Sequence, residues 1–161
     1  MGDGAVTVDV ARHGAARKVP VRGLKAKARR ILRLLDLKDC ELSVALVGDE
    51  EIRRLNGRYR ARDEPTDVLA FPTEDPPPSG PRLIGDVVIS VEKAARQARQ
   101  RRRSLDDELE VLLVHGILHN LGYDHERSPE DERTMRAMER RLRRELKAGS
   151  RMQPHRPFHA A

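Results

Sequence analysis

Three histidines near residue 120 have a spacing that suits a metal ion. They stand at positions 115, 119 and 125, in the stretch His-Gly-Ile-Leu-His-Asn-Leu-Gly-Tyr-Asp-His. On a helix, His115 and His119 are separated by about 40° of rotation and about 6 Å of rise, so their rings can converge. Gly122 can take the left-handed conformation that ends a helix, and His125 follows just beyond that turn. Three imidazoles without a fourth protein ligand describe a zinc site with an open position for a reactive water.

Two other interpretations of these histidines have to be weighed. A single histidine on an apolar face is more often a hydrogen-bonded core residue, but three of them around a helix-stopping glycine favour a metal site. The spacing also equals that of the metzincin proteases, whose general base is a glutamate directly after the first histidine. Gly116 stands at that position here. A metallopeptidase therefore stays an alternative against which the missing base argues.

The composition indicates one domain with an aliphatic core. The chain has 161 residues, no Trp, two Tyr, two Phe and a single cysteine, Cys40. One cysteine excludes an internal disulfide framework and a zinc held mainly by thiolates, which fits a reducing, cytoplasmic setting. We see no signal peptide and no apolar stretch long enough to span a membrane, so we expect no membrane partner.

The charge balance favours a polyanionic partner. The formal net charge is +6 and the sequence pI is about 10.0. Arginines gather at 96, 99 and 101–103, and again at 58, 60 and 62. Contact with a phosphate backbone is one interpretation of these clusters, and an ordinary solvated surface is the other. The scarcity of aromatic residues argues against binding dominated by base stacking.

Hydrophobic periodicity predicts the elements that must position the histidines. Alternating or continuous apolar runs predict strands near 6–10, 42–46, 68–71 and 84–90, with Gly85 marking a bulge or a close approach. Helical spacing predicts helices near 24–37, 50–59 and 91–101, then a helix after Ser104 that carries the histidines and a last helix after Ser128. The histidine helix is apolar on most sides and is therefore expected to be central and buried. The last helix is expected to bury a Met and Leu stripe and to expose its arginines to solvent.

Two further expectations concern a glycine and the chain end. Gly116 costs about 1 kcal/mol in a helix relative to alanine, so a neighbouring strand or room beside the metal should require it. We place the domain at residues 1–147 and expect 148–161 to be a disordered basic tail.

Three motifs together resemble one known family. They are Leu55-Asn56-x-x-Tyr59-Arg60-x-x-Asp63-x-Pro65-Thr66-Asp67-Val68-Leu69-x-Phe71-Pro72, Gly85-Asp86-Val87-Val88-Ile89-Ser90 and His115-Gly116-x-Leu118-His119-x-Leu121-Gly122-Tyr123-Asp124-His125. Over roughly residues 40–147 the chain resembles the YbeY family of bacterial endoribonucleases and rRNA maturation factors. Asn120 and Ala70 depart from the residues common in that family, Leu and Ser, but neither is a ligand position. Asn120 indicates either a less buried helix face or a bond to something nearby.

The resemblance implies a fold, a cofactor and an activity. The fold is a single α+β domain with a small mixed sheet, of about four strands, packed by helices. One Zn²⁺ per chain is bound by His115, His119 and His125. The enzyme is a hydrolase that cleaves single-stranded RNA in small-subunit rRNA 3′-end maturation and ribosome quality control. The implied partners are rRNA, the small ribosomal subunit and its assembly factors, with no DNA expected. The family's functionally important arginine falls on Arg60.

A working mechanism follows from the charges. Three neutral imidazoles leave the +2 charge of zinc uncompensated, which favours an anionic substrate, and the forked guanidinium of Arg60 suits phosphate oxygens. Arg60 and His115 are therefore the predicted catalytic residues. Asp124 either orients a histidine or caps the turn, and no general base is evident. A non-catalytic, zinc-stabilised ribosome-assembly factor is the remaining alternative, although structural zinc usually has four protein ligands.

Overall fold

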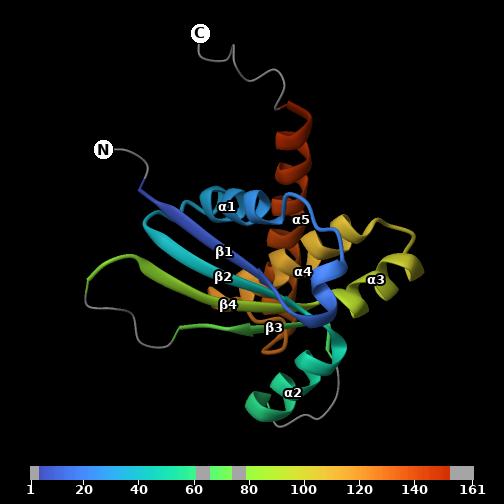
Figure 1. Cartoon of the computed structure of the whole chain (residues 1–161). Coiled ribbons are helices and arrows are strands. Elements are labelled where there is room, and N and C mark those ends of the chain that lie inside the picture. Colours follow the sequence, from blue (N-terminus) through green and yellow to red (C-terminus); the bar gives the residue numbers. More distant parts are fainter. Residues whose placement is uncertain (1–3, 61–65, 74–78, 153–161) are drawn as a thin grey trace.

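The computed structural model describes residues 4–60, 66–73 and 79–152 (Figure 1). The elements are β1 (Val6–Arg12), the 3-10 helix η1 (Gly14–Lys18), α1 (Leu24–Leu34), β2 (Cys40–Val47), α2 (Asp49–Arg60), β3 (Val68–Phe71), β4 (Arg82–Ser90), α3 (Val91–Gln100), α4 (Leu105–Asn120) and α5 (Pro129–Met152). Each strand and α-helix expected from periodicity is present. The sequence pattern does not predict η1.

The strands form one mixed sheet. Their order is β1-β2-β4-β3, with β1 parallel to β2, β2 parallel to β4, and β3 antiparallel to β4. Helix α1 connects the parallel pair β1 and β2, as such a crossover requires. The expected α+β domain with a small mixed sheet is confirmed.

Gly85 follows a bulge and is itself a point of close approach. The register between β2 and β4 shifts between Glu41 and Leu42, which leaves Ile84 of β4 as the extra residue. Gly85 has a φ of +115°, and a Cβ there would collide with the carbonyl oxygen of Phe71. A side chain at residue 85 would therefore push β3 away from β4.

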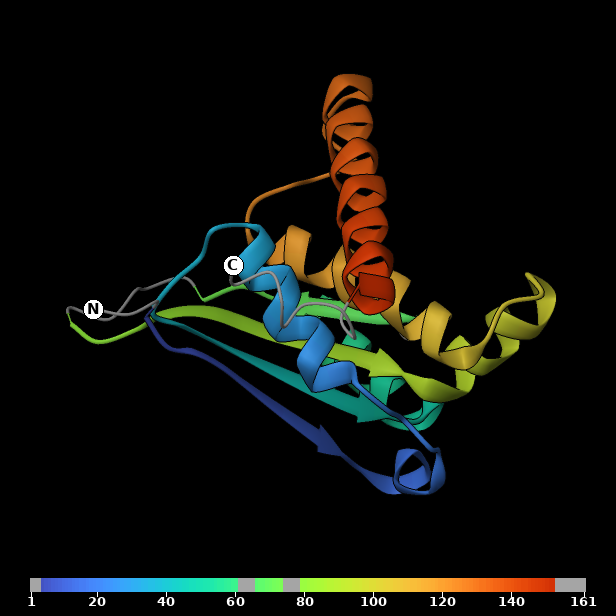
Figure 2. The same cartoon turned by 90° about the horizontal axis from the view of Figure 1, so that it is seen from above.

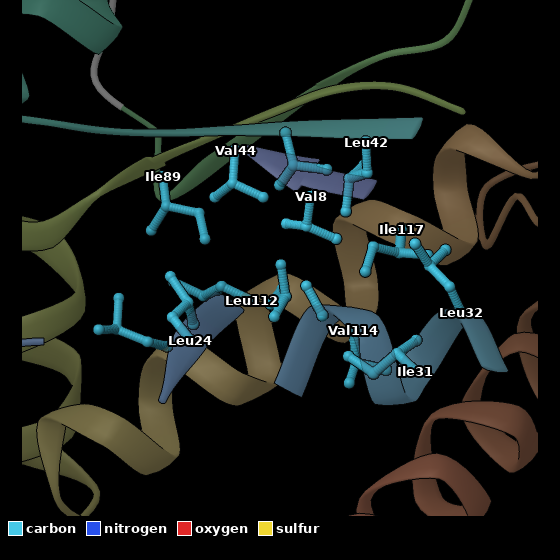
Figure 3. Close-up of a cluster of buried hydrophobic side chains, with 14 of the residues drawn as sticks. Val8, Leu24, Ile31, Leu32, Leu42, Val44, Ile89, Leu112, Val114 and Ile117 are labelled. Atoms are coloured by element: carbon cyan, nitrogen blue, oxygen red, sulfur yellow. The ribbon is translucent and has the colours of Figure 1, made fainter. Parts of the chain in front are cut away.

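The helices cover the two sheet faces unequally. Helices α1, α4 and α5 lie over one face, and α2 lies on the other (Figures 1 and 2). Figure 3 shows the main core, where Val8, Val44 and Ile89 from the strands point toward residues of α1 and α4 such as Leu24 and Ile117. On the opposite face Ile52 of α2 packs with Val47, Leu69 and Val88.

Helix α4 is the central helix of the fold. Leu109, Leu113, Val114, Ile117 and Leu118 of α4 have no exposed surface. The Oγ of Ser104 accepts a hydrogen bond from the backbone N–H of Asp107, which caps the helix start as expected. At the other end Gly122 has a φ of +104°, and the N–H of Tyr123 donates to the carbonyl of Leu118. This is the glycine-terminated helix end that the sequence predicts.

Gly116 lets α4 approach strand β4. A Cβ at this position would lie 2.7 Å from Cγ1 of Val87, a contact too short to persist without movement. Approach by a neighbouring strand, one of the two reasons expected from the sequence, is therefore confirmed, and the contact is made by a side chain. A β-branched valine fixed in a strand has little freedom to move aside.

We expect Gly116→Ala to destabilise the fold although alanine favours helices. Overpacking costs about 1–3 kcal/mol, whereas the gain in helix propensity is about 1 kcal/mol, so the net loss should be about 1 kcal/mol. Urea unfolding followed by circular dichroism measures it. In a Val87→Ala background the same substitution should stabilise the protein. An equal cost in both backgrounds would show that Val87 is not the cause.

Helix α5 extends beyond the domain boundary expected from the sequence. It continues to Met152, so residues 148–152 are helical and the expected tail does not begin at Ala148. The guanidinium of Arg30 lies against Gly149 and donates a hydrogen bond of 3.4 Å to the carbonyl of Glu145, which ties α1 to this end of the helix. Residues 153–161 lie outside the described part of the chain. Within that part, no helix is long and apolar enough to cross a bilayer.

Candidate active site at the end of helix α4

The structure brings two of the three predicted ligands together. The ring centroids of His115 and His125 lie 5.2 Å apart, with the ring planes at 60°. Two imidazoles bound to one tetrahedral zinc at about 2.0 Å have centroids about 5 Å apart, so the observed separation suits a shared metal. The Nδ1 of His125 is buried and has no hydrogen-bond partner within the described residues. The geometry and the donor chemistry of this pair therefore fit a metal ion.

His119 lies one helical turn after His115, and its Nδ1 is buried. Among the described residues, however, no three side chains of His, Cys, Asp or Glu form a group arranged to hold a metal. The three-histidine site thus stays a prediction, of which the structure assembles the pair His115 and His125.

A carboxylate that the sequence analysis missed contacts the first histidine. Oε2 of Glu139 lies 2.7 Å from Nδ1 of His115 and joins α5 to α4. Glu139 is four residues after the buried Met135 and three before the buried Leu142, so it lies on the inner side of α5. Its place in this stripe is the sequence signal that Glu139 faces inward, although the stripe does not identify His115 as its partner.

The two histidines face a pocket between α4 and α5 with a volume of about 450 Å³. The residues that line it include His115, His125, Glu132, Glu139 and four arginines, Arg101, Arg136, Arg140 and Arg143. Three of these arginines come from α5. Arg136 and Arg140 are exposed to solvent, as expected for the last helix, but they also line this pocket, which the sequence analysis did not predict.

Buried acids of α4 hold several of the arginines in place. Glu108 is fully buried, and its carboxylate pairs with Arg101 at 2.9 Å and with Arg103 at 3.5 Å. Glu110 is also buried, and it pairs with Lys27 at 3.1 Å and with Arg143 at 3.5 Å. These pairs restrain Arg101 and Arg143 beside the pocket.

Another member of the arginine cluster at 96–103 has a structural partner. Arg96 lies 2.9 Å from Asp49 at the start of α2. Burial alone would raise the pKa of Asp49, but hydrogen bonds from Arg96 and Ser90 outweigh it and hold that pKa below its ordinary value. Three of the five arginines in the cluster, Arg96, Arg101 and Arg103, therefore pair with carboxylates of the protein itself, and contact with a phosphate backbone stays a prediction.

Arg60 belongs to the helix on the sheet face opposite the histidines. It is the last residue of α2, the helix that lies opposite α4, and its side chain lies outside the described structure. The preceding residue, Tyr59, packs edge-on against Phe71 at 5.5 Å and lines a second pocket of about 640 Å³. Asp86 lines the same pocket, and burial raises the pKa of its carboxyl group. The described residues do not bring Arg60 together with the histidines.

Asn120 and Asp124, which lie close to the histidines in the chain, each make a hydrogen bond to the backbone. Nδ2 of Asn120 donates a hydrogen bond of 3.0 Å to the carbonyl of Asp86, so this residue bonds α4 to β4. Oδ1 of Asp124 accepts a hydrogen bond of 2.9 Å from the N–H of Glu126, which is the contact of a residue that caps its own turn.

These features define a class: a small α+β protein that places one histidine of its central helix and one just beyond that helix on a pocket rich in arginines. Such a site suits an enzyme that acts on an anionic substrate. The sequence profile described as "Endoribonuclease YbeY" matches residues 9–147, and the chain belongs to this family.

Individual relatives agree with this assignment. An "Endoribonuclease YbeY" of Anaeromyxobacter sp. (strain Fw109-5) is 48% identical over 139 residues, which are 86% of this chain and 71% of the relative. One of Aquifex aeolicus (strain VF5) is 47% identical over 123 residues, 76% of this chain and 81% of the relative. A solution structure from Thermotoga maritima is similar in fold, with a TM-score of 0.63 and 28% identity, and the match covers 91% of this chain and 93% of that one.

Proposed function

We propose that this chain is a zinc-dependent endoribonuclease that cleaves single-stranded RNA during maturation of the small-subunit rRNA 3′ end and in ribosome quality control. Membership of the endoribonuclease family supports hydrolysis of RNA phosphodiester bonds. The observation that carries the metal-dependent part is the pair His115 and His125, 5.2 Å apart on an arginine-lined pocket. The small ribosomal subunit and its assembly factors in the cytoplasm are the proposed partners and setting.

Each group of residues in the site has a distinct proposed role. His115, His119 and His125 would hold the zinc, which when bound would supply a Lewis acid and an activated water. Arg60 would donate hydrogen bonds to the phosphate that reacts and stabilise the charge that develops on it. The arginines of the pocket would bind neighbouring phosphates and orient the strand. Because imidazole also binds nickel, copper and iron, the identity of the metal is part of the proposal.

The proposal is tested with purified protein and a single-stranded RNA oligonucleotide that resembles an rRNA 3′ end. We expect about one zinc per chain and cleavage of this RNA, with little cleavage of the same sequence as a duplex or as DNA. Casein serves as the substrate of the rival metallopeptidase and should remain intact. Bound zinc with no RNA cleavage under any salt condition would favour the assembly-factor alternative.

Arg140 is the residue with which to test whether the pocket binds the RNA backbone. It is exposed, lines the pocket and has no ion-pair partner in the described part of the chain. We expect Arg140→Ala to weaken RNA binding about three- to tenfold and to lower the slope of log Kd against log salt by about one. Fluorescence anisotropy with labelled RNA measures both quantities.

Arg141→Ala is the matched control for this measurement. Arg141 is also exposed, but it does not line the pocket, and both variants remove one positive charge from α5. Equal losses in the two variants would mean that RNA responds to the net charge of the helix and has no specific contact in the pocket.

A further inference from the structure

A hydrogen bond joins the first predicted ligand on α4 to a carboxylate on α5. Nδ1 of His115 and Oε2 of Glu139 are 2.7 Å apart, within the range of charge-assisted hydrogen bonds. Both side chains are partly shielded from water, with exposed fractions of 32% for His115 and 25% for Glu139. The contact is therefore a short hydrogen bond between two partly buried side chains.

This hydrogen bond determines which ring nitrogen is free. An ionised carboxylate only accepts hydrogen bonds, so the shared proton belongs to Nδ1 of His115. A neutral imidazole that is protonated at Nδ1 has its lone pair on Nε2. The bond also fixes the rotation of the ring, because Glu139 is held by its own helix.

The backbone around Glu139 is well fixed. Met135 is four residues before it and Leu142 three after it, and their exposed fractions are only 1% and 2%. These two side chains anchor α5 to the core on both sides of Glu139. The carboxylate therefore approaches His115 from a rigid element.

We propose that Glu139 is the positioning residue of the metal site. It holds His115 in the tautomer that offers Nε2 to the metal, and it orients the ring toward the pocket. Carboxylates that accept a hydrogen bond from a ligating histidine act in this way in metal sites generally. The inference rests on the metal-dependent function proposed above, and it adds a residue that acts through His115.

The first test needs no metal. In metal-free protein near pH 8, NMR correlations of the imidazole nitrogens with the ring protons identify the tautomer of His115, and His115→Ala assigns the signals. We expect the Nδ1–H tautomer to dominate in the wild type. In Glu139→Gln the signals should shift toward a mixture of the two tautomers.

The second test measures zinc affinity by competition with a chromophoric chelator. We expect Glu139→Gln to weaken zinc binding about 10- to 100-fold. Glu132→Gln is the matched control, because Glu132 lies on the same helix, lines the same pocket and pairs with Arg136 at 2.8 Å. It removes the same charge and should leave both the zinc affinity and the tautomer of His115 unchanged.

The two readouts separate the possible failures. A folded Glu139→Gln protein with wild-type tautomer signals and wild-type zinc affinity would overturn the inference. If that variant does not fold, Glu139→Asp replaces it, and its shorter side chain should move both readouts in the same direction by less. Failure of the wild type to cut RNA would contradict the proposed activity but would leave the tautomer and zinc results valid.

Discussion

Protein that carries His119→Ala is expected to lose its zinc and its RNA cleavage together. The predicted site has three imidazoles and no fourth protein ligand, so loss of one leaves two donors that cannot hold the ion firmly. We expect zinc content to fall from about one per chain to near zero and the cleavage rate to fall by more than about 100-fold. Metal analysis and a gel assay with the single-stranded oligonucleotide measure the two effects on one preparation.

His13→Ala is the control for His119→Ala. His13 is exposed and lies just before η1, and its side chain makes no capping hydrogen bond there. This variant removes one imidazole from elsewhere and should keep full zinc content and activity. Circular dichroism establishes that both variants are folded. A His119→Ala protein that keeps stoichiometric zinc and cuts RNA would contradict the assignment of this ligand.

Arg60→Ala is expected to abolish RNA cleavage while zinc content stays at the wild-type value. A guanidinium that stabilises charge in the transition state contributes about 10²- to 10³-fold to the rate, and it contributes nothing to the metal ligands. Arg60→Lys should recover little of this loss, because an ammonium group cannot donate the paired hydrogen bonds of a guanidinium. Single-turnover cleavage rates and metal analysis measure the two quantities separately.

The neighbouring arginine supplies the control for Arg60. Arg58 is on the same helix, is exposed, and lies 5.9 Å from the centre of the Tyr59 ring. Arg58→Ala changes the charge of α2 equally, so we expect it to keep most of the activity. Full activity in Arg60→Ala would remove this arginine from the mechanism.

Local sequence patterns predicted the elements because each pattern depends on near neighbours. Alternation of apolar residues identified the strands, and hydroxyl caps identified helix starts, as the bond from the Asp131 N–H to Ser128 Oγ illustrates. Gly122 predicted the end of α4 because few other residues accept its positive φ. Helix α5 continues past the expected boundary through Gly149, a weak helix former by itself, against which the guanidinium of Arg30 from α1 lies.

The sequence by itself determined the type of chemistry: histidines at helical spacing, a glycine stop after them, and motifs that belong to a family of endoribonucleases. Only the tertiary structure decided what surrounds the first histidine. Glu139 is 24 residues from His115 in the chain, and no local periodicity links positions on two different helices. The same holds for the arginines that Glu108 and Glu110 restrain beside the pocket. Such contacts depend on how α4 and α5 pack, which is set by the whole buried core.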